Sequence, residues 1–429
     1  MRKFIILVFC TLFFSSLNAE QNLKYFIIKA IDNNLTLNAE RKKLESAKQD
    51  KNVSRSEFLP SITIIGDQTS STTTNRVDQS GSSLTDTNLD TENKIISLEQ
   101  KVFSGFKALN TFKKTELETQ KAVLELKQVE QQTIIDTAFA YYDLIYKSKS
   151  EKFNLSNVNL FERQVEFDNA RLQKGEITLT DLAQSESSLA GANASLIKAK
   201  TEMTVSITNF ERVTREKIPN LDLLSEKIIL DLPTSLNSSL ELSKFNNVDL
   251  LIAELNFKIA AKNLNIERAR ISPSASIKVS KSETKDFSST IDEKNDETIK
   301  ASITWPIIKG GENISSIKKA SFDKQRAQLL LQDTKNKITS ETSNSWSKYQ
   351  SSKSVLEATK AQLKAAEIAN EGITLEYDSG NSRTTLELVQ SRSLLLDARI
   401  AFAKSERDFI VSQFELANQV GTLSPKSIK

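Results

Sequence analysis

The sequence predicts a mainly α-helical fold with a small β part, and three observations lead to it. Two stretches, 106–174 and 312–379, carry apolar residues at every third or fourth position and contain no proline. This spacing is typical of amphipathic helices. As a single helix the first stretch would be roughly 100 Å long at 1.5 Å per residue. Short alternating segments precede each stretch and indicate strands, and the two halves of the chain resemble each other.

The resemblance between the halves indicates a tandem duplication, which decides the fold before any element is assigned. A shift of 205 residues superposes Gly105 on Gly310 and Gly175 on Gly380. A shift of 206 superposes Leu182, Gln184 and Ser185 on Leu388, Gln390 and Ser391. We therefore expect a first repeat at 20–215, a linker at 216–236, a second repeat at 237–421 and a C-terminal tail at 422–429.

The first 19 residues have the pattern of a signal peptide, with a basic start, an apolar core and a small-residue cleavage site at Leu17–Ala19. The single cysteine, Cys10, lies inside this segment, and Phe9 before it does not fit a lipidation site. No later stretch is apolar for 18 residues, so no transmembrane helix is predicted.

Composition excludes several function classes for the chain that remains. It has no histidine and no cysteine, so it offers no imidazole base, no thiol nucleophile and no His/Cys metal site. We expect neither an enzyme nor a cofactor. Acidic and basic residues are interspersed, which is typical of a solvated surface rather than a nucleic-acid interface.

Each repeat is expected to contain the same elements in the same order. In the first they are a helix at 20–57, a β-hairpin at 58–104 with a polar loop at 69–93, the helix at 106–174, a turn near Gly175 and a return helix from 178. In the second they are a helix at 235–270, a hairpin at 271–309 with a polar loop at 280–297, the helix at 312–379, a turn near Gly380 and a return helix from 382. Each chain would thus supply four helical columns of equal height, which side by side build a tube.

The second hairpin carries an apolar stripe on one face, and the residues between its members are polar. The stripe consists of Ile299, Ala301, Ile303, Trp305 and Ile307, and the polar neighbours are Lys300, Ser302 and Thr304. Pro306 requires an edge or terminal place in its strand. We expect the stripe to face lipid and its neighbours to face a lumen, as in outer-membrane barrels.

Four strands cannot close a barrel alone, and an open edge in hydrocarbon leaves backbone groups unsatisfied. We therefore expect a barrel formed by several chains, with eight, twelve or sixteen strands from two, three or four copies.

At this point the chain resembles the TolC-type outer-membrane efflux and secretion channels over its whole mature length. The resemblance rests on duplicated strand entries, strand ends and turns. These are 58–62 and 271–275, 98–105 and 303–310, and the turns 171–175 and 377–380 that precede 181–182 and 387–388.

This resemblance implies a homotrimer in the outer membrane, with a twelve-stranded barrel that continues into an α-helical tunnel across the periplasm and a belt around the linker. It also implies a periplasmic adaptor and an inner-membrane transporter, of an efflux pump or a type I secretion system, as partners. Drugs, metals and secreted proteins remain open as cargo. The alternatives from the sequence are a soluble coiled-coil adaptor or structural protein, which leaves the duplicated hairpins unexplained, and a carboxylate hydrolase, for which a Gly-rich framework is missing.

The resemblance further implies a gate near the two turns. In the family a Thr–Asp pair on one hairpin is held by a Tyr and an Arg on the other, above a ring of acids. The matching residues are Thr180, Asp181, Tyr377, Arg383 and Glu387, with Gln390 where a second acid is usual. We expect Gly175 and Gly380 at the tips to contact the adaptor. The alternative for the polar residues is a solvated helix surface.

Overall fold

The computed structural model describes residues 22–218, 230–288, 290–379 and 383–428. The chain divides into two compact units, and both draw on both repeats. The strand unit contains Ala39–Gln128 and Lys244–Thr339, and the hairpin unit contains the segments up to Asn38, Val129–Ser243 and from Ser340 onward. Among the described residues, no helix combines the length and apolarity that crossing a membrane requires.

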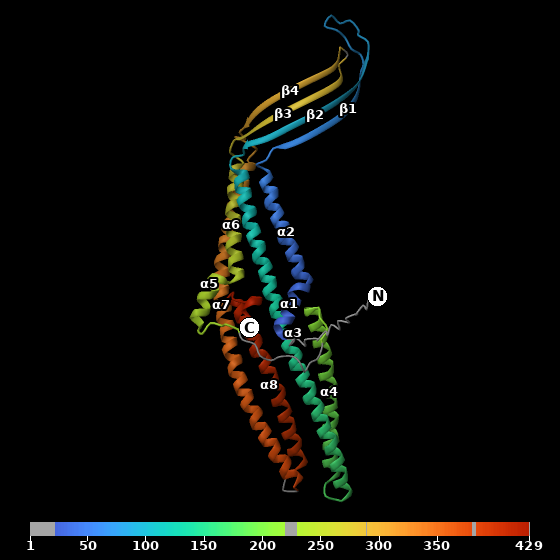
Figure 1. Cartoon of the computed structure of the whole chain (residues 1–429), viewed down its shortest axis with the longest axis vertical. Coiled ribbons are helices and arrows are strands. Elements are labelled where there is room, and N and C mark those ends of the chain that lie inside the picture. Colours follow the sequence, from blue (N-terminus) through green and yellow to red (C-terminus); the bar gives the residue numbers. More distant parts are fainter. Residues whose placement is uncertain (1–21, 219–229, 289, 380–382, 429) are drawn as a thin grey trace, which may run out of the picture. The chain divides into compact units, whose positions relative to one another are not determined.

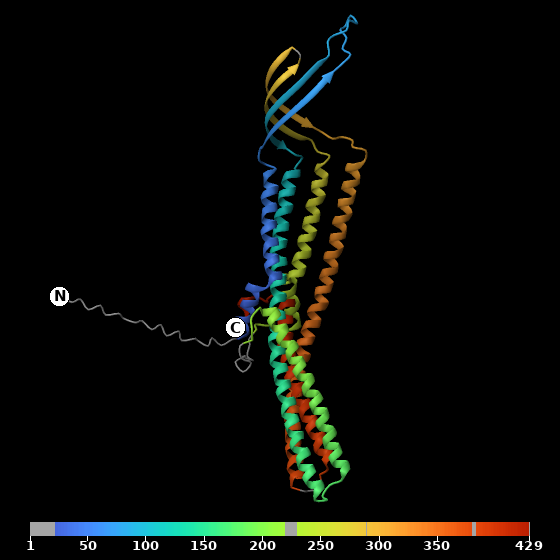
Figure 2. The same cartoon turned by 90° about the vertical axis from the view of Figure 1, so that its right-hand side faces the viewer.

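The two helices predicted from periodicity are present as single elements. Helix α3 is Lys107–Gln173 and helix α7 is Glu312–Asp378. Each returns through a turn into a shorter helix, α4 (Leu179–Thr214) or α8 (Thr385–Gln419). In the hairpin unit these form two antiparallel helical hairpins, and α4 packs on α8 (Figure 2).

The core of the hairpin unit gathers segments that are far apart in the sequence. Phe26 of α1 (Leu23–Asn33) lies between Tyr141 of α3 and Phe210 of α4, with ring centroids 5.8 and 4.9 Å away. The C-terminal segment closes this cluster, because Leu423 and Ile428 are buried in it. The carbonyl of Leu423 accepts a hydrogen bond from the Gln131 side chain at 3.0 Å.

The helices predicted at 20–57 and 235–270 are each broken once, which corrects the expectation of continuous helices. The first consists of α1 and α2 (Leu35–Ser56), and the second of α5 (Leu236–Asn246) and α6 (Val248–Ala269). Each break occurs at an asparagine whose side chain caps the helix that follows. Asn34 Oδ1 accepts from the backbone N–H of Thr36 and Leu37, at 2.9 and 3.1 Å, and Asn247 Oδ1 accepts from that of Leu250 at 3.1 Å. These are N-cap hydrogen bonds that start a new helix.

The four strands form one antiparallel sheet in the order β1-β2-β3-β4 (Figure 1). The strands are β1 Ser61–Thr73, β2 Thr87–Phe103, β3 Ser274–Ser288 and β4 Ile291–Thr304. Within the described residues, β1 and β4 each have one edge without a strand partner. The sheet is therefore open at both sides.

The strands extend further than their alternation of apolar and polar residues predicts. The segments 69–93 and 280–297 were predicted to be polar loops, but the pairing continues to Thr73↔Thr87 and Lys285↔Glu293. Both faces of these outer parts are polar, so the alternation of apolar and polar residues that identified the strands is absent, although threonine itself favours strands. A β-strand can lack an apolar face where water contacts both sides.

The second hairpin ends earlier than expected. β4 stops at Thr304, so Trp305, Pro306 and Ile307 lie after the last strand pair. The indole N–H of Trp305 donates to the carbonyl of Ile271 at 3.0 Å. Pro306 was predicted to take an edge or terminal place in its strand, but it lies two residues after the strand end, where its missing backbone N–H interrupts no strand pair.

Candidate functional site

The turn of the first helical hairpin has a defined geometry at both helix ends. Gly175 has a φ of +75°, and its N–H donates to the Leu172 carbonyl, while the N–H of Glu176 donates to the Arg171 carbonyl, both at 2.9 Å. This is a Schellman motif, in which glycine takes the left-handed position without strain. A capping box then starts α4: Asp181 accepts from the Thr178 N–H at 3.0 Å and its N–H donates to Thr178 Oγ1 at 3.3 Å.

The second hairpin starts its return helix in the same way. Glu387 accepts from the N–H of Thr384 at 2.8 Å, and its own N–H donates to Thr384 Oγ1 at 3.2 Å. Arg383 binds Glu387 at 3.0 Å and Glu376, at the end of α7, at 2.5 Å. Gly380, the expected tip, lies outside the described residues.

These contacts are those of one chain, and the predicted clasp stays a prediction for the assembled channel. Asp181 was expected to be held by Tyr377 and Arg383, but its carboxylate caps its own helix, and Arg383 pairs with acids of its own hairpin. The physical reason is local: an acid at the third helical position satisfies backbone N–H groups that have no partner inside the helix. Thr180 and Gln390 are exposed in the single chain.

Tyr377 does link the two hairpins, but through Asp168, a residue that is not part of the predicted clasp. Its hydroxyl donates to Asp168 Oδ1 at 2.9 Å, and Asp168 belongs to α3 while Tyr377 belongs to α7. Both are buried: Asp168 is 0% exposed and Tyr377 3%. A charged carboxylate at such a place must be fully hydrogen-bonded to be tolerated.

Asp168 meets this requirement with three donors. Ser185 of α4 donates to Oδ2 at 2.5 Å, and Gln164 donates to Oδ1 at 2.9 Å beside the tyrosine hydroxyl. Gln164 also donates to the Tyr377 oxygen at 3.1 Å, and the Thr385 hydroxyl lies 3.2 Å from that oxygen. Elements α3, α4, α7 and α8 therefore all contribute to one buried polar cluster, the inter-hairpin cluster.

Two arginines surround this cluster. The Arg171 guanidinium lies 5.3 Å from the centre of the Tyr377 ring, and its Nε is 3.3 Å from Glu176. Arg392 of α8 donates to the Leu160 carbonyl of α3 at 3.4 Å. Burial lowers the pKa of Arg392, and Asp378, Tyr377 and Asp168 oppose this shift. Burial is also the main reason why the pKa of Tyr377 is raised, so the phenol remains protonated and donates to Asp168.

The sequence did carry a signal for Asp168. It lies on the buried stripe of α3, at helical spacing from Val158, Phe161 and Gln164, where the period demands an apolar residue. The duplication adds a second signal, because the 205-residue shift places Asp168 on Ile373 and Tyr377 on Leu172. Each polar partner thus replaces an apolar residue of the other copy.

In the strand unit, the register places apolar residues of all four strands in one row. Ile299 lies opposite Val279, Val279 opposite Leu98, and Leu98 opposite Ile62. Residues directly opposite in an antiparallel sheet share a face, so this row and the stripe around Ile303 form one apolar face. Ile299 is 79% exposed and Ile303 81%. A solvent-exposed apolar face of this kind marks a surface that contacts lipid or another chain.

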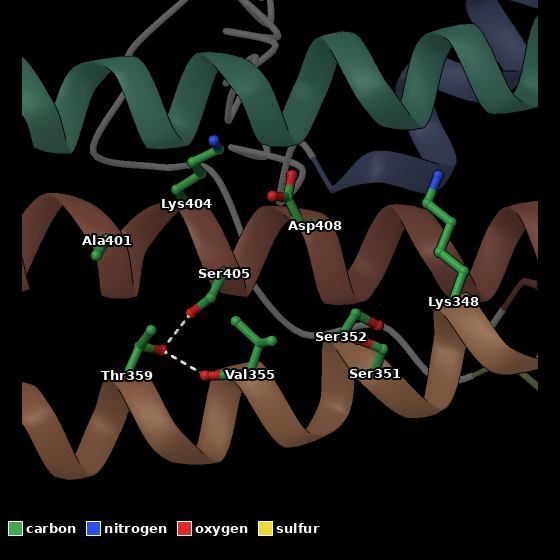
Figure 3. A pocket seen from close by; sticks show the side chains of 9 residues that line it. All are labelled: Lys348, Ser351, Ser352, Val355, Thr359, Ala401, Lys404, Ser405 and Asp408. Carbon is green, nitrogen blue, oxygen red and sulfur yellow. Dashed lines mark hydrogen bonds between the residues drawn. The ribbon is translucent and has the colours of Figure 1, made fainter.

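A groove of about 370 Å³ runs between α7 and α8 in the hairpin unit. Figure 3 shows Thr359 of α7 hydrogen-bonded towards Ser405 of α8. The two hydroxyl oxygens are 2.7 Å apart, and those of Ser352 and Ser412 are also 2.7 Å apart. Small hydroxyl residues thus hold α7 and α8 together, and the groove is the space between two paired helices rather than a binding site.

Comparisons with known proteins agree with this geometry. The family model described as "Outer membrane efflux protein" matches residues 26–214 and 240–422, one segment in each repeat. The outer membrane efflux protein BepC of Brucella suis is 23% identical, with 93% of this chain and 85% of the relative covered. The outer membrane protein TolC of Escherichia coli is 21% identical, with 97% and 85% covered. Among solved structures, the CmeC outer membrane channel of Campylobacter jejuni is similar with a TM-score of 0.83 at 16% identity, with 94% and 86% covered.

Proposed function

The chain belongs to the outer membrane efflux protein family, and we propose that three copies of it assemble into the exit duct of a tripartite export system. It is an outer-membrane protein that extends into the periplasm and lets substrates leave the cell. Its relatives are channel and efflux proteins. The partners of the duct are a periplasmic adaptor and an inner-membrane transporter.

The open sheet carries the proposal of a trimer. β1 and β4 have free edges in the described chain, and the sheet has one apolar face. In a membrane such edges must pair, because unpaired backbone groups in hydrocarbon cost several kcal/mol each. If β1 of one copy pairs with β4 of the next, three copies close a barrel of twelve strands, with the apolar face towards lipid.

Cysteine cross-linking between the two edge strands tests this arrangement. Thr63 of β1 and Thr298 of β4 lie on the polar face, separated by β2 and β3. Three strand spacings of about 4.8 Å exceed the Cα separation of about 7 Å that a disulfide tolerates, so a Thr63→Cys/Thr298→Cys pair cannot close within one chain. Oxidation in membranes should link chains up to a trimer.

The control is each single cysteine, which should give dimers at most. The mature chain contributes no cysteine of its own, so every cross-link comes from the introduced residues. Neighbouring positions on β4 cover the unknown register between chains. A chain that inserts into membranes and stays monomeric in mild detergent would contradict the proposal.

The inter-hairpin cluster supports a gate at the periplasmic end. The contact between Tyr377 and Asp168 joins the hairpins α3–α4 and α7–α8, and it is buried and hydrogen-bonded rather than solvated. Individually such contacts are worth about 0.5–3 kcal/mol, which suits a closure that partner binding can open. The turn at Gly175 lies at the end of the first of these hairpins, where an adaptor can bind.

A further inference from the structure

The root of the sheet, where the strands join the helices, carries an excess of positive charge on its polar face. Lys278 of β3 lies directly opposite Lys300 of β4 and, on its other side, opposite Glu99 of β2. Lys101 is two residues further along β2, so it shares this face. Lys107, the first residue of α3, lines the same hollow as Lys101. We call these four lysines the basic collar.

The lysines of the collar have no ion-pair partner among the described residues, unlike the cations beside them. Arg270 is 2.6 Å from Glu267 and 3.4 Å from Glu312, and Lys309 is 2.9 Å from Glu312. All four collar lysines are exposed. Like charges directly opposite each other in a sheet are unfavourable, so the pair Lys278–Lys300 favours an anion nearby.

The collar borders a hollow with further groups that bind anions. The hollow has a volume of about 460 Å³, and its charged lining residues are four cations, Lys101, Lys107, Arg270 and Lys309, and one acid, Glu99. A series of hydroxyl side chains lines it as well. These hydroxyls belong to Ser104, Ser272, Ser274, Ser276, Ser302 and Thr304. Ammonium groups and hydroxyls both donate hydrogen bonds to carboxylate and phosphate oxygens.

The positive charge is confined to this root. Further out on the same face, Lys294 pairs with Asp296 at 2.8 Å, and Asp67 accepts a hydrogen bond from Asn93 at 3.3 Å. On the opposite face, Lys281 pairs with Glu297 at 3.2 Å. The collar is therefore a local feature and does not follow from the net charge of the chain, which is only +3.

We propose that the basic collar makes the passage from the helical tunnel into the barrel selective for anions, so that cargo bearing carboxylate or phosphate groups passes preferentially. This rests on the proposed trimer, in which the polar face lines the lumen and three collars form one ring. Rings of lysine and arginine side chains select anions in other pores. In low-dielectric surroundings their field attracts anions and repels cations.

Reversal potentials across planar bilayers with a salt gradient test the proposal. Lys278→Glu/Lys300→Glu should shift the reversal potential of the trimer towards cation selectivity, and Lys278→Gln/Lys300→Gln should give a smaller shift of the same sign. Inorganic tripolyphosphate, added on the barrel side, should reduce the conductance of the unmodified channel and lose this effect in the double Glu variant. The matched control is Lys281→Gln, which removes a lysine of the same strand from the opposite face and should leave selectivity unchanged.

The outcomes separate this proposal from the function on which it rests. If channels form and neither double substitution changes the reversal potential, the collar has no role in selectivity, and the proposal of a trimeric duct is unaffected. A shift of equal size in Lys281→Gln would also overturn the proposal. If the unmodified protein neither forms a trimer in mild detergent nor conducts, the proposed trimeric duct is wrong.

Discussion

Replacing Tyr377 by phenylalanine should weaken the contact between the two helical hairpins with little other change. The substitution removes the hydroxyl that donates to Asp168 and keeps the ring, which Arg171 covers. A hydrogen bond to a charged group is worth about 1.5–3 kcal/mol. A loss of about 2 kcal/mol changes an equilibrium between a closed and an open tip about 30-fold.

Single-channel conductance of the purified protein in planar bilayers measures this change. We expect Tyr377→Phe to raise the open probability, and Asp168→Asn to act in the same direction because it removes the charge that the three donors hold. Two control variants address the turns alone. Asp181→Asn perturbs only the cap of α4, and Arg383→Ser only the pairing within the second hairpin.

The controls also decide between the two assignments of the gate. If Asp181→Asn or Arg383→Ser opened the channel more than Tyr377→Phe, the clasp expected from the family resemblance would be correct in the trimer, and the inter-hairpin cluster would be a packing feature. If Tyr377→Phe left the conductance unchanged, the cluster would have no part in gating.

Three further predictions concern the apolar face of the sheet, the turn at Gly175 and the stability of the two capping boxes at low pH. Ile303→Arg places a charge on the apolar face and should lower the yield in the outer-membrane fraction; a lipid-facing charge costs about 2–4 kcal/mol at the bilayer midplane and less towards the interfaces. Thr304→Arg on the other face should mainly alter conductance, and equal tolerance of both changes would contradict the assigned faces. In Gly175→Leu the new Cβ meets no atom within 4 Å, but the backbone φ of +75° is strained for leucine, so the trimer should persist while export in cells falls. The control is Gly191→Leu, where a Cβ also meets no atom. Equal export by both variants would exclude the tip as the adaptor contact. The hydrogen bonds of the two capping boxes lower the pKa of Asp181 and of Glu387 from the ordinary values of 3.8 and 4.5. The stabilisation from these carboxylates is therefore present above those values and is lost as the pH falls below them. Hydrogen exchange in the first turns of α4 and α8 should accelerate in that acid range, and a rate independent of pH after correction for intrinsic exchange would refute this.

Long-range periodicity made the helices predictable, since a 67-residue stretch such as α3 repeats its signal many times. The two helix breaks were not predicted, because each depends on a single residue. Asn34 and Asn247 break helices whose apolar spacing continues almost undisturbed across them, because a side-chain cap changes the backbone without changing the pattern. The outer parts of the strands were missed because both of their faces are polar, so the alternation of apolar and polar residues is absent there.

For the candidate site, family resemblance identified Tyr377 but not its partner. The partner depends on which residues of α3 and α7 meet in space, and spacing along one helix does not contain that information. Asp181 and Glu387 were recognised as acids at equivalent positions, but their local role as helix caps could also be read from the Thr three residues before each. A capping signature therefore competes with any functional assignment at a helix start.

The contact between Asp168 and Tyr377 has a consequence for stoichiometry. The duplication gives a trimer six similar helical hairpins, an arrangement with approximate sixfold symmetry. Asp168 occurs only in the first copy and Tyr377 only in the second, each replacing an aliphatic residue of the other. The pairing is thus between unlike halves and occurs once per chain, so the assembly contains three such contacts rather than six. A chain rebuilt from two identical repeats would keep the tube but would place a leucine opposite Asp168, or an isoleucine opposite Tyr377, at this junction, and neither combination supplies a donor and an acceptor together.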